Sequence, residues 1–196
     1  MKYILIALLL FPLFSAAQTL DNLNFGFPIK NGKVVYQLTV DVKGMEKKSL
    51  FTSSMNWFSD NFKDSNMVIE IEDELTGHIL GTGRLLIIAK TKEKFVKGLI
   101  FVFNFRIEIF CNDNKSIIKI SDIEADAPGF FSHYNVPLED FPFIKLSNPP
   151  KSWQLNRINV SKHAINDAFE LLLKKFDNRV NITGQDALNT SATVAY

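Results

Sequence analysis

The sequence predicts an α+β domain, a two-layer sandwich in which a five-stranded antiparallel sheet carries two helices on one face. Five segments alternate apolar and polar residues with a period of two, as strands do. Two other segments repeat apolar residues at helical spacing, and such one-sided helices must bury their apolar side against a sheet. The predicted order is strand, helix, four strands, long loop and helix.

The first residues have the composition of an export signal. Lys2 is followed by an apolar run over residues 3–14 and by small residues before Gln18. The run is too short, and too broken by Pro12, for a stable membrane span. We therefore expect a signal peptide over residues 1–17, no transmembrane segment after cleavage, and a periplasmic or extracellular protein. A retained membrane anchor is the alternative.

The overall composition disfavours several classes of protein. With 22 basic and 21 acidic residues, the chain has no electrostatic reason to bind nucleic acid or an anionic membrane. Its single cysteine, Cys111, cannot form an internal disulfide. Because Cys111 ends an apolar strand pattern, we expect a buried, unreactive thiol rather than a nucleophile. The 18 phenylalanines supply material for the core that must stabilise the fold instead.

The first strand and the first helix have clear patterns. From Lys33 to Lys43 apolar and polar residues alternate, and Gly44 ends the strand. A helix is predicted over residues 46–62, because one apolar stripe with helical spacing contains Phe51, Met55, Phe58 and Phe62. Such a stripe can contact a ligand, but packing on a sheet is the commoner cause.

Four strand patterns follow the helix. In the first, Met67, Ile69 and Ile71 alternate with glutamates. The others are predicted over residues 79–90, 99–110 and 116–124, and the "CNDNK" sequence between the last two is a tight-turn signal. The short connections indicate an antiparallel sheet.

The last third of the chain is predicted to hold a loop, a helix and a tail. Residues 125–160 have no sustained period and contain five prolines, so they form a long loop. A helix follows over residues 161–177, with Ser161 as N-cap and a stripe of Ile165, Phe169, Leu172 and Phe176. We expect residues 178–196 to be a mobile polar tail, which leaves residues 18–177 as a single domain.

A set of residues within 33–124 resembles a known family. The set consists of Gly44, Leu50, Asn56, Trp57, Phe58, Phe62, Asp73, Gly77, Gly81 and Gly83. In this order, behind a signal peptide, they resemble a family of exported Bacteroidetes proteins, a domain of unknown function described as having a TATA-binding-protein-like fold. The resemblance implies the element order β-α-β-β-β-β-α, which agrees with the order derived above. It implies no activity and no catalytic residue, since a fold name describes shape alone.

Three glycines between residues 77 and 83 raise the question of a phosphate site. A P-loop or a dinucleotide fingerprint would be followed by a helix, whereas here "RLLIIAK" predicts a strand. Period two instead places Gly81 and Gly83 on the core face, where they allow close packing or bending. We expect Trp57 or Phe58 to fill the space that they leave.

No sequence motif indicates a metal or a catalytic site. Three acidic residues alternate as at the start of a calcium loop, namely Asp122, Glu124 and Asp126. However, Ala127 and His133 stand where the glycine and the bidentate glutamate should be, so carboxylates on a solvated strand face explain the pattern better. His78, expected in a turn, and His163, expected in the first turn of a helix, lack metal spacing. We expect no enzyme, no metal and no cofactor.

The long loop is the feature that the fold does not require. Its rings could cover the sheet face opposite the helices, where the apolar side chains are Leu80, Leu86, Ile88, Ile100 and Val102. Alternatively it forms a surface for a partner, since aromatic residues and arginine are enriched in such surfaces. The candidate binding surface consists of Arg84, Arg106, Phe130, Phe131, Tyr134 and Trp153.

We therefore expect an exported, non-enzymatic binding or assembly module of the bacterial cell envelope. It would hold an envelope protein or peptide on the sheet face opposite the helices and on the 125–160 loop. The alternative is a carrier of an apolar small molecule, bound in a cavity between helix and sheet that Gly81 and Gly83 would widen. A solid core beneath Phe169 and Phe176 would argue against that carrier. An enzyme whose catalytic pair forms only on folding is a third possibility.

Overall fold

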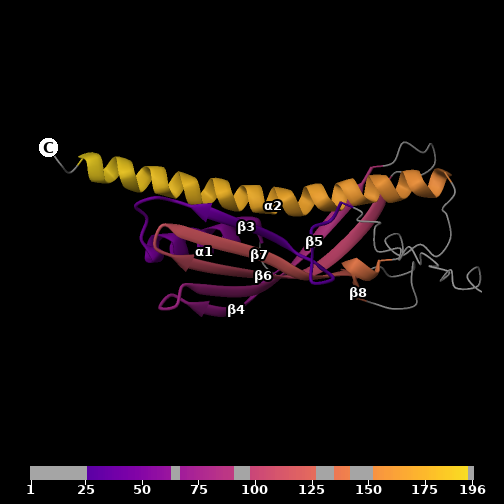
Figure 1. The fold of residues 1–196 in the computed structure, drawn as a ribbon, viewed down its shortest axis with the longest axis horizontal. Helices are drawn as coiled ribbons and strands as arrows, with labels where there is room; N and C mark the ends of the chain where they lie inside the picture. The colour runs from indigo at the N-terminus through magenta and orange to yellow at the C-terminus, as the bar shows by residue number, and fades with distance from the viewer. Residues whose placement is uncertain (1–25, 63–66, 91–97, 127–134, 142–151, 194–196) are drawn as a thin grey trace, which may run out of the picture.

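The computed structural model describes residues 26–62, 67–90, 98–126, 135–141 and 152–193. It confirms the α+β class (Figure 1). The five long strands of the main sheet are β3 (Tyr36–Asp41), β4 (Met67–Asp73), β5 (His78–Ala89), β6 (Leu99–Asn112) and β7 (Lys115–Asp126). Their order is β3-β7-β6-β5-β4, with antiparallel neighbours throughout. A short sixth strand, β8 (Val136–Pro137), pairs with β7, so the sheet has one strand more than predicted.

The predicted strand from Lys33 is split in two. Its start, β2 (Lys33–Val34), pairs with β1 (Ile29–Lys30) in a separate two-stranded sheet. Asn31 and Gly32 connect the two strands with φ angles of 53° and 76°. Two successive left-handed residues are what a tight hairpin turn requires, and the Asn-Gly pair provides them.

The first helix, α1 (Lys47–Asn61), lies where its apolar spacing predicts it. The buried side is formed by Leu50, Phe51, Ser53, Ser54, Trp57 and Phe58. Met55, which the predicted stripe contained, is only partly buried, whereas Trp57 is almost completely buried. The indole ring therefore faces the sheet, and the helix packs over β6 and β7.

The second helix, α2 (Ser152–Thr193), is much longer than predicted. The predicted helix covered residues 161–177, but residues 152–160, expected in the loop, and residues 178–193, expected in the tail, are also helical. The reason is that the buried stripe continues in both directions, through Ile158 and Ser161 to Phe176 and Val180. Ser161 is thus a buried residue inside the helix rather than its N-cap. Figure 1 shows α2 running along the whole sheet, with its C-terminal turns extending beyond it.

The described part of the predicted 125–160 loop packs on the helix side of the sheet. It contains β8 and a short 3-10 helix, η4 (Leu138–Asp140), so it is not without regular structure. Leu138 and Phe141 are buried, and the Phe141 ring centre lies 6.0 Å from that of Phe101 and 6.4 Å from that of Phe103. These side chains complete the core, so this part of the loop does not cover the opposite face.

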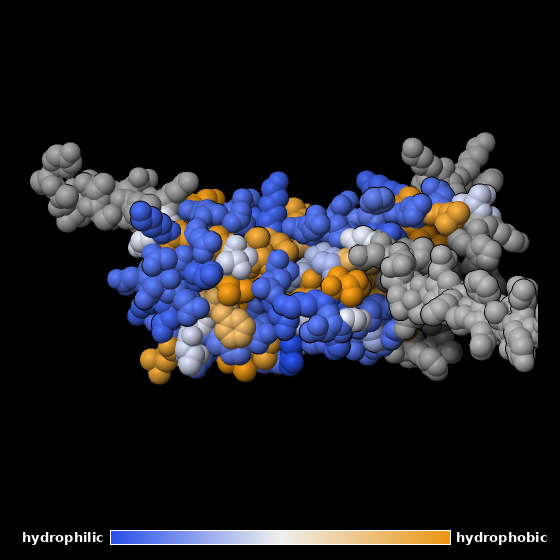
Figure 2. All heavy atoms as spheres, in the orientation of Figure 1, coloured by the Kyte–Doolittle hydropathy of each residue, from blue (hydrophilic) through white to orange (hydrophobic). Residues whose placement is uncertain are grey.

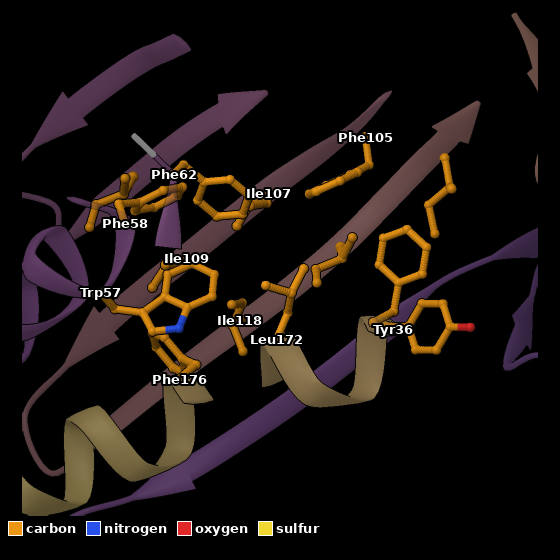
Figure 3. Close-up of a cluster of buried hydrophobic side chains, with 14 of the residues drawn as sticks. Tyr36, Trp57, Phe58, Phe62, Phe105, Ile107, Ile109, Ile118, Leu172 and Phe176 are labelled. Atoms are coloured by element: carbon orange, nitrogen blue, oxygen red, sulfur yellow. The ribbon is translucent and has the colours of Figure 1, made fainter. Parts of the chain in front are cut away.

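Aromatic rings fill the core between α2 and the sheet (Figure 3). The Phe176 ring meets the Trp57 indole edge-on, with centroids 5.4 Å apart. Phe169 stacks on Tyr36 at 5.1 Å and meets the edge of Phe105 at 5.2 Å. Both Phe169 and Phe176 are completely buried. The region in which an apolar carrier would need its cavity is occupied by these side chains.

Candidate functional site

The face of the sheet opposite the helices is here called the outer face. Antiparallel pairing of His78 with Phe110, and of Arg84 with Asn104, sets the register of β5 and β6. Because side chains alternate along a strand, the even-numbered residues of both strands lie on this face. The odd-numbered residues, such as Ile107 and Ile109, point into the core.

One end of the outer face carries an apolar patch, formed by Leu86, Ile88, Ile100 and Val102. These residues are direct neighbours, since Leu86 pairs with Val102 and Ile88 with Ile100. The side chains of Leu86, Ile88 and Ile100 are 59%, 53% and 65% exposed. Leu80, expected to need the same cover, is only 9% exposed. Figure 2 shows apolar side chains gathered in patches between hydrophilic ones on the surface.

The rest of the outer face is crossed by ion pairs. The Arg84 guanidinium donates to an Asp126 carboxylate oxygen at 2.9 Å, beside the apolar patch. The Arg106 guanidinium donates to Glu70 at 3.1 Å and so joins β6 to β4. In both pairs an arginine charge on the outer face is matched by a carboxylate.

A third group of charges lies at the other end of the outer face. His78 stacks on Phe110 with ring centres 4.6 Å apart, and its Nε2 lies 3.3 Å from Glu108 Oε1. The other oxygen of Glu108 accepts a bond from Lys119 at 3.4 Å. His78 is the first residue of β5 and part of this cross-strand network, whereas the sequence predicted it in a turn. His163 lies inside α2 rather than in its first turn.

The acidic residues at the end of β7 belong to separate contacts. Asp122 accepts a bond from Lys33 at 2.9 Å, and this bond holds the pKa of its carboxyl below the usual range. Its φ of 49° marks a bulge in β7, where the pairing with β6 shifts between Asn104 and Arg106. Asp126 instead binds Arg84. Among the described residues, no three side chains of the metal-binding types lie close enough together to hold an ion.

The predicted site residues fall in different places. Arg84 and Arg106 lie on neighbouring strands of the outer face. Trp153 lies in the first turn of α2, in the helical layer, where it is 51% exposed and the Arg157 guanidinium is 5.0 Å from its ring centre. The structure thus places the two arginines on one face and Trp153 in the other layer. The remaining candidates, Phe130, Phe131 and Tyr134, lie outside the described residues.

The glycines of β5 have a packing role. Gly81 and Gly83 are buried on the core face, as predicted. A Cβ atom on Gly83 would lie 2.7 Å from the Phe105 ring and 3.2 Å from the Phe62 ring. The space is therefore filled, but by Phe62 and Phe105 rather than by Trp57 or Phe58. Sequence periodicity placed the glycines correctly, whereas their neighbours depend on tertiary packing.

Asp73 and Gly77, two residues of the set that resembles the family, stabilise the turn between β4 and β5. Asp73 accepts bonds from the Leu75 and Thr76 backbone and from the Thr76 hydroxyl, at 2.9, 3.2 and 2.7 Å. These bonds lower the pKa of Asp73, with the Thr76 hydroxyl as the largest cause. Gly77 has a φ of 73°, and its carbonyl accepts a bond from the Cys111 backbone at 2.8 Å. The motif is thus largely a structural framework.

An open hollow of about 550 Å³ lies at the start of α1. The first backbone N–H of the helix, which faces it, already has a hydrogen-bond acceptor. Residues of the β6–β7 turn line the hollow together with the first residues of α1. The Asp113 carboxylate accepts a bond from the Lys47 backbone N–H at 2.8 Å, which caps the helix. The Asn114 side chain likewise accepts a bond from the Gly44 backbone at 2.6 Å.

The single cysteine is buried, as predicted. Cys111 has no exposed surface, and its Sγ lies 3.5 Å from Ser54 Oγ and 3.6 Å from Ser116 Oγ. Burial raises the pKa of the thiol, which keeps it protonated and poorly nucleophilic. Neither α1 nor the described part of α2 contains an apolar stretch long enough to cross a membrane.

Comparison with known proteins identifies the fold family. Residues 36–125 match the family "Domain of unknown function (DUF4468) with TBP-like fold". A DUF4468 family protein from Bacteroides ovatus has a similar structure, with a TM-score of 0.57 and 17% identity over 76% of this chain and 90% of that one. A TBP-like protein from Parabacteroides distasonis has a TM-score of 0.56 and 18% identity, over 77% and 97% of the two chains.

No curated protein matches the sequence significantly. The family match covers β3 to β7 with α1, which are the elements that carry the glycines and the outer face. Over residues 36–125 this chain therefore matches the DUF4468 family, and it shares the TBP-like fold of the two solved structures.

Proposed function

We propose that the protein is a non-enzymatic binding module that holds an envelope protein or peptide on its outer face. The apolar patch carries this proposal, because Leu86, Ile88 and Ile100 are each more than half exposed on adjacent strands. Neighbouring apolar side chains left open to water are typical of interaction surfaces. The Arg84–Asp126 pair beside them would provide a polar rim, as interfaces usually have.

Several contacts favour binding over catalysis. On the outer face, Asp126 and Glu70 are engaged by arginines and Asp122 by Lys33. A carboxylate oxygen that already accepts from an arginine or lysine is less available to contact a substrate. The only thiol is buried in the core. These side chains stabilise the sheet and leave the apolar patch as the most accessible feature of the face.

The core argues against the alternative of an apolar carrier. Phe169 packs against three other rings, those of Tyr36, Phe103 and Phe105, and Phe176 packs against Trp57. A ligand beneath α2 would have to displace these rings, each of which contributes several kcal/mol of burial (about 3–5 kcal/mol on truncation). We therefore favour an external binding surface.

Export is part of the same proposal. The apolar run over residues 3–14 and the small residues before Gln18 support cleavage of a leader. Mass spectrometry of the protein recovered from its native cells should find a mature chain that begins at Gln18. Recovery of the uncleaved chain from the membrane fraction would instead support a retained anchor.

The binding proposal is tested by crosslinking from the patch. A photoreactive residue at position 86 should capture a discrete partner in envelope extracts, and the substitutions Ile88→Ser and Ile100→Ser should remove that product. The matched control carries the photoreactive residue at position 171, since Leu171 on α2 is 51% exposed. The same product from both positions, or a product unaffected by the two substitutions, would contradict a specific outer-face site.

A further inference from the structure

The two edges of the sheet differ in how well they are covered. At one edge, β3 lies under α2, where Tyr36 stacks on Phe169 and its hydroxyl donates to Asn166 at 3.1 Å. At the other edge, β4 pairs with β5 and with no further strand in the part of the chain that the structure describes, while the helices pack mainly over the remaining strands. Figure 1 shows β4 on the side of the sheet away from α2. The outer backbone groups of β4 are thus open to another strand.

The edge of β4 presents an apolar side chain on each face. Ile69 pairs with Gly81 on the core side, and Ile71 pairs with Leu80 on the outer side. The change of side follows from a bulge between Ile69 and Ile71. The two isoleucines are 37% and 39% exposed. An added strand would cover both of them.

The charge of β4 selects the kind of strand that fits. The segment from Ile69 to Leu75 contains the acidic residues Glu70, Glu72, Asp73 and Glu74 and no basic residue. Glu70 is paired with Arg106 and Glu74 with Lys48, whereas Glu72 is exposed. A second copy of β4 would place carboxylates beside carboxylates, and like charges across strands are destabilising. A basic strand would meet complementary charge instead.

We propose that the free edge of β4 binds an extended segment of another protein in which lysine or arginine alternates with apolar residues. The backbone edge supplies hydrogen bonds, Ile71 supplies apolar contact on the outer face, and Glu72, which pairs with Ile79 on the core side, supplies the charge preference on the opposite face. This site is separate from the apolar patch of the outer face and does not depend on the function proposed above. It predicts a second partner surface on the same domain.

The test uses the full mature chain and a labelled peptide with the sequence Lys-Ile-Lys-Val-Lys-Ile-Lys. Fluorescence anisotropy should detect binding, and hydrogen exchange should show new protection within residues 67–73. A peptide with glutamate in place of each lysine should bind at least about tenfold more weakly, since several charge pairs become repulsive. A peptide with N-methyl groups on alternate amides should also lose about tenfold or more, because it cannot form the strand bonds.

Two variants locate the site. Glu72→Lys should weaken binding about two- to fivefold, as expected for one surface charge pair. Leu86→Ser, in the apolar patch, should leave binding unchanged. Equal affinity of the N-methylated peptide would overturn strand addition, and equal loss with Leu86→Ser would move the site to the outer face. Because the crosslinking experiment uses positions 86, 88 and 100, failure of either proposal is recognised without the other.

Discussion

Single residues at turns and close approaches determine how tightly this domain packs. Gly83 lies where the Phe62 and Phe105 rings meet β5, and Gly77 lies where the β4–β5 turn touches Cys111. Asp73 ties the same turn together through three accepted hydrogen bonds. Local geometry therefore accounts for Asp73, Gly77 and Gly83, three of the residues that carry the family resemblance.

Replacing Gly83 with alanine should destabilise the domain. The new Cβ would lie 2.7 Å from Phe105 Cε2, so a ring must move, and overpacking of this kind costs about 1–3 kcal/mol. Urea unfolding followed by tryptophan fluorescence measures the loss. Thr82→Ala, on the neighbouring residue, is the control and should have a smaller effect. If Gly83→Ala lowers the free energy of unfolding equally in the wild type and in a Phe105→Leu variant, the contact with the Phe105 ring is not the cause of the destabilisation.

Asp73 should make the domain sensitive to acid. Its folded pKa is lowered, so its contribution to stability is present above the ordinary aspartate pKa of about 3.9 and is lost as the pH falls through the lowered value. The melting temperature of the wild type should exceed that of Asp73→Asn at pH 6, and the difference should shrink below about pH 4. A difference that stays constant down to pH 2.5 would show that the charge has no part in it.

At the scale of elements, connections between distant segments set the helix ends. The first helix has no side-chain cap of its own at Glu46, and the β6–β7 turn supplies one through Asp113. The second helix stays against the body of the domain as far as Gly184, where an added Cβ would clash with the Val42 side chain. Both helices are thus positioned by contacts with residues far away in the sequence.

Removing the Asp113 cap should destabilise the start of α1. The variant Asp113→Ala leaves the Lys47 N–H without its acceptor, and loss of a cap costs about 0.5–2 kcal/mol. Asp113→Asn keeps an oxygen acceptor and should lose less, which separates the hydrogen bond from the charge. Denaturant unfolding of the three proteins measures the order. Equal losses for both variants would assign the effect to charge alone.

The two helices show what a single sequence can predict. The ends of α1 were predictable because its stripe begins after Gly44 and stops at Phe62, beside clear turn residues. The ends of α2 were not, because the stripe continues through Ser161 and Gly184, which are small or polar residues that only tertiary contacts bury. Likewise, the sheet face of Gly83 followed from period two, but its contact with Phe62 did not. The candidate arginines were placed on the correct strands, whereas their partners Asp126 and Glu70 required the folded register.

At the scale of the whole molecule, the last segment of the chain completes the fold. Val180 is completely buried, and Arg179 lies 3.5 Å from Asp60 of α1. Arg179 and Val180, which composition assigned to a tail, therefore belong to the folded part of the domain.

Truncation after Asp177 should weaken the domain. It removes Val180, and burial of such a side chain contributes about 1.5–3 kcal/mol. The melting temperature of residues 18–177 should be lower than that of residues 18–196, and truncation after Gly184 should retain more of the stability. If residues 18–177 melt at the same temperature as the longer chain, the helical extension contributes nothing to the fold.

The position of Phe169 and Phe176 in α2 has a consequence for the order of folding. These rings pack against Tyr36 and Trp57, which leave the ribosome more than a hundred residues earlier. The core cannot close until the C-terminal helix exists, and contacts of such long range slow folding. Most of the chain therefore emerges before it can become compact. Under the export proposed above, this delay would keep the chain unfolded while it is threaded through a translocation channel.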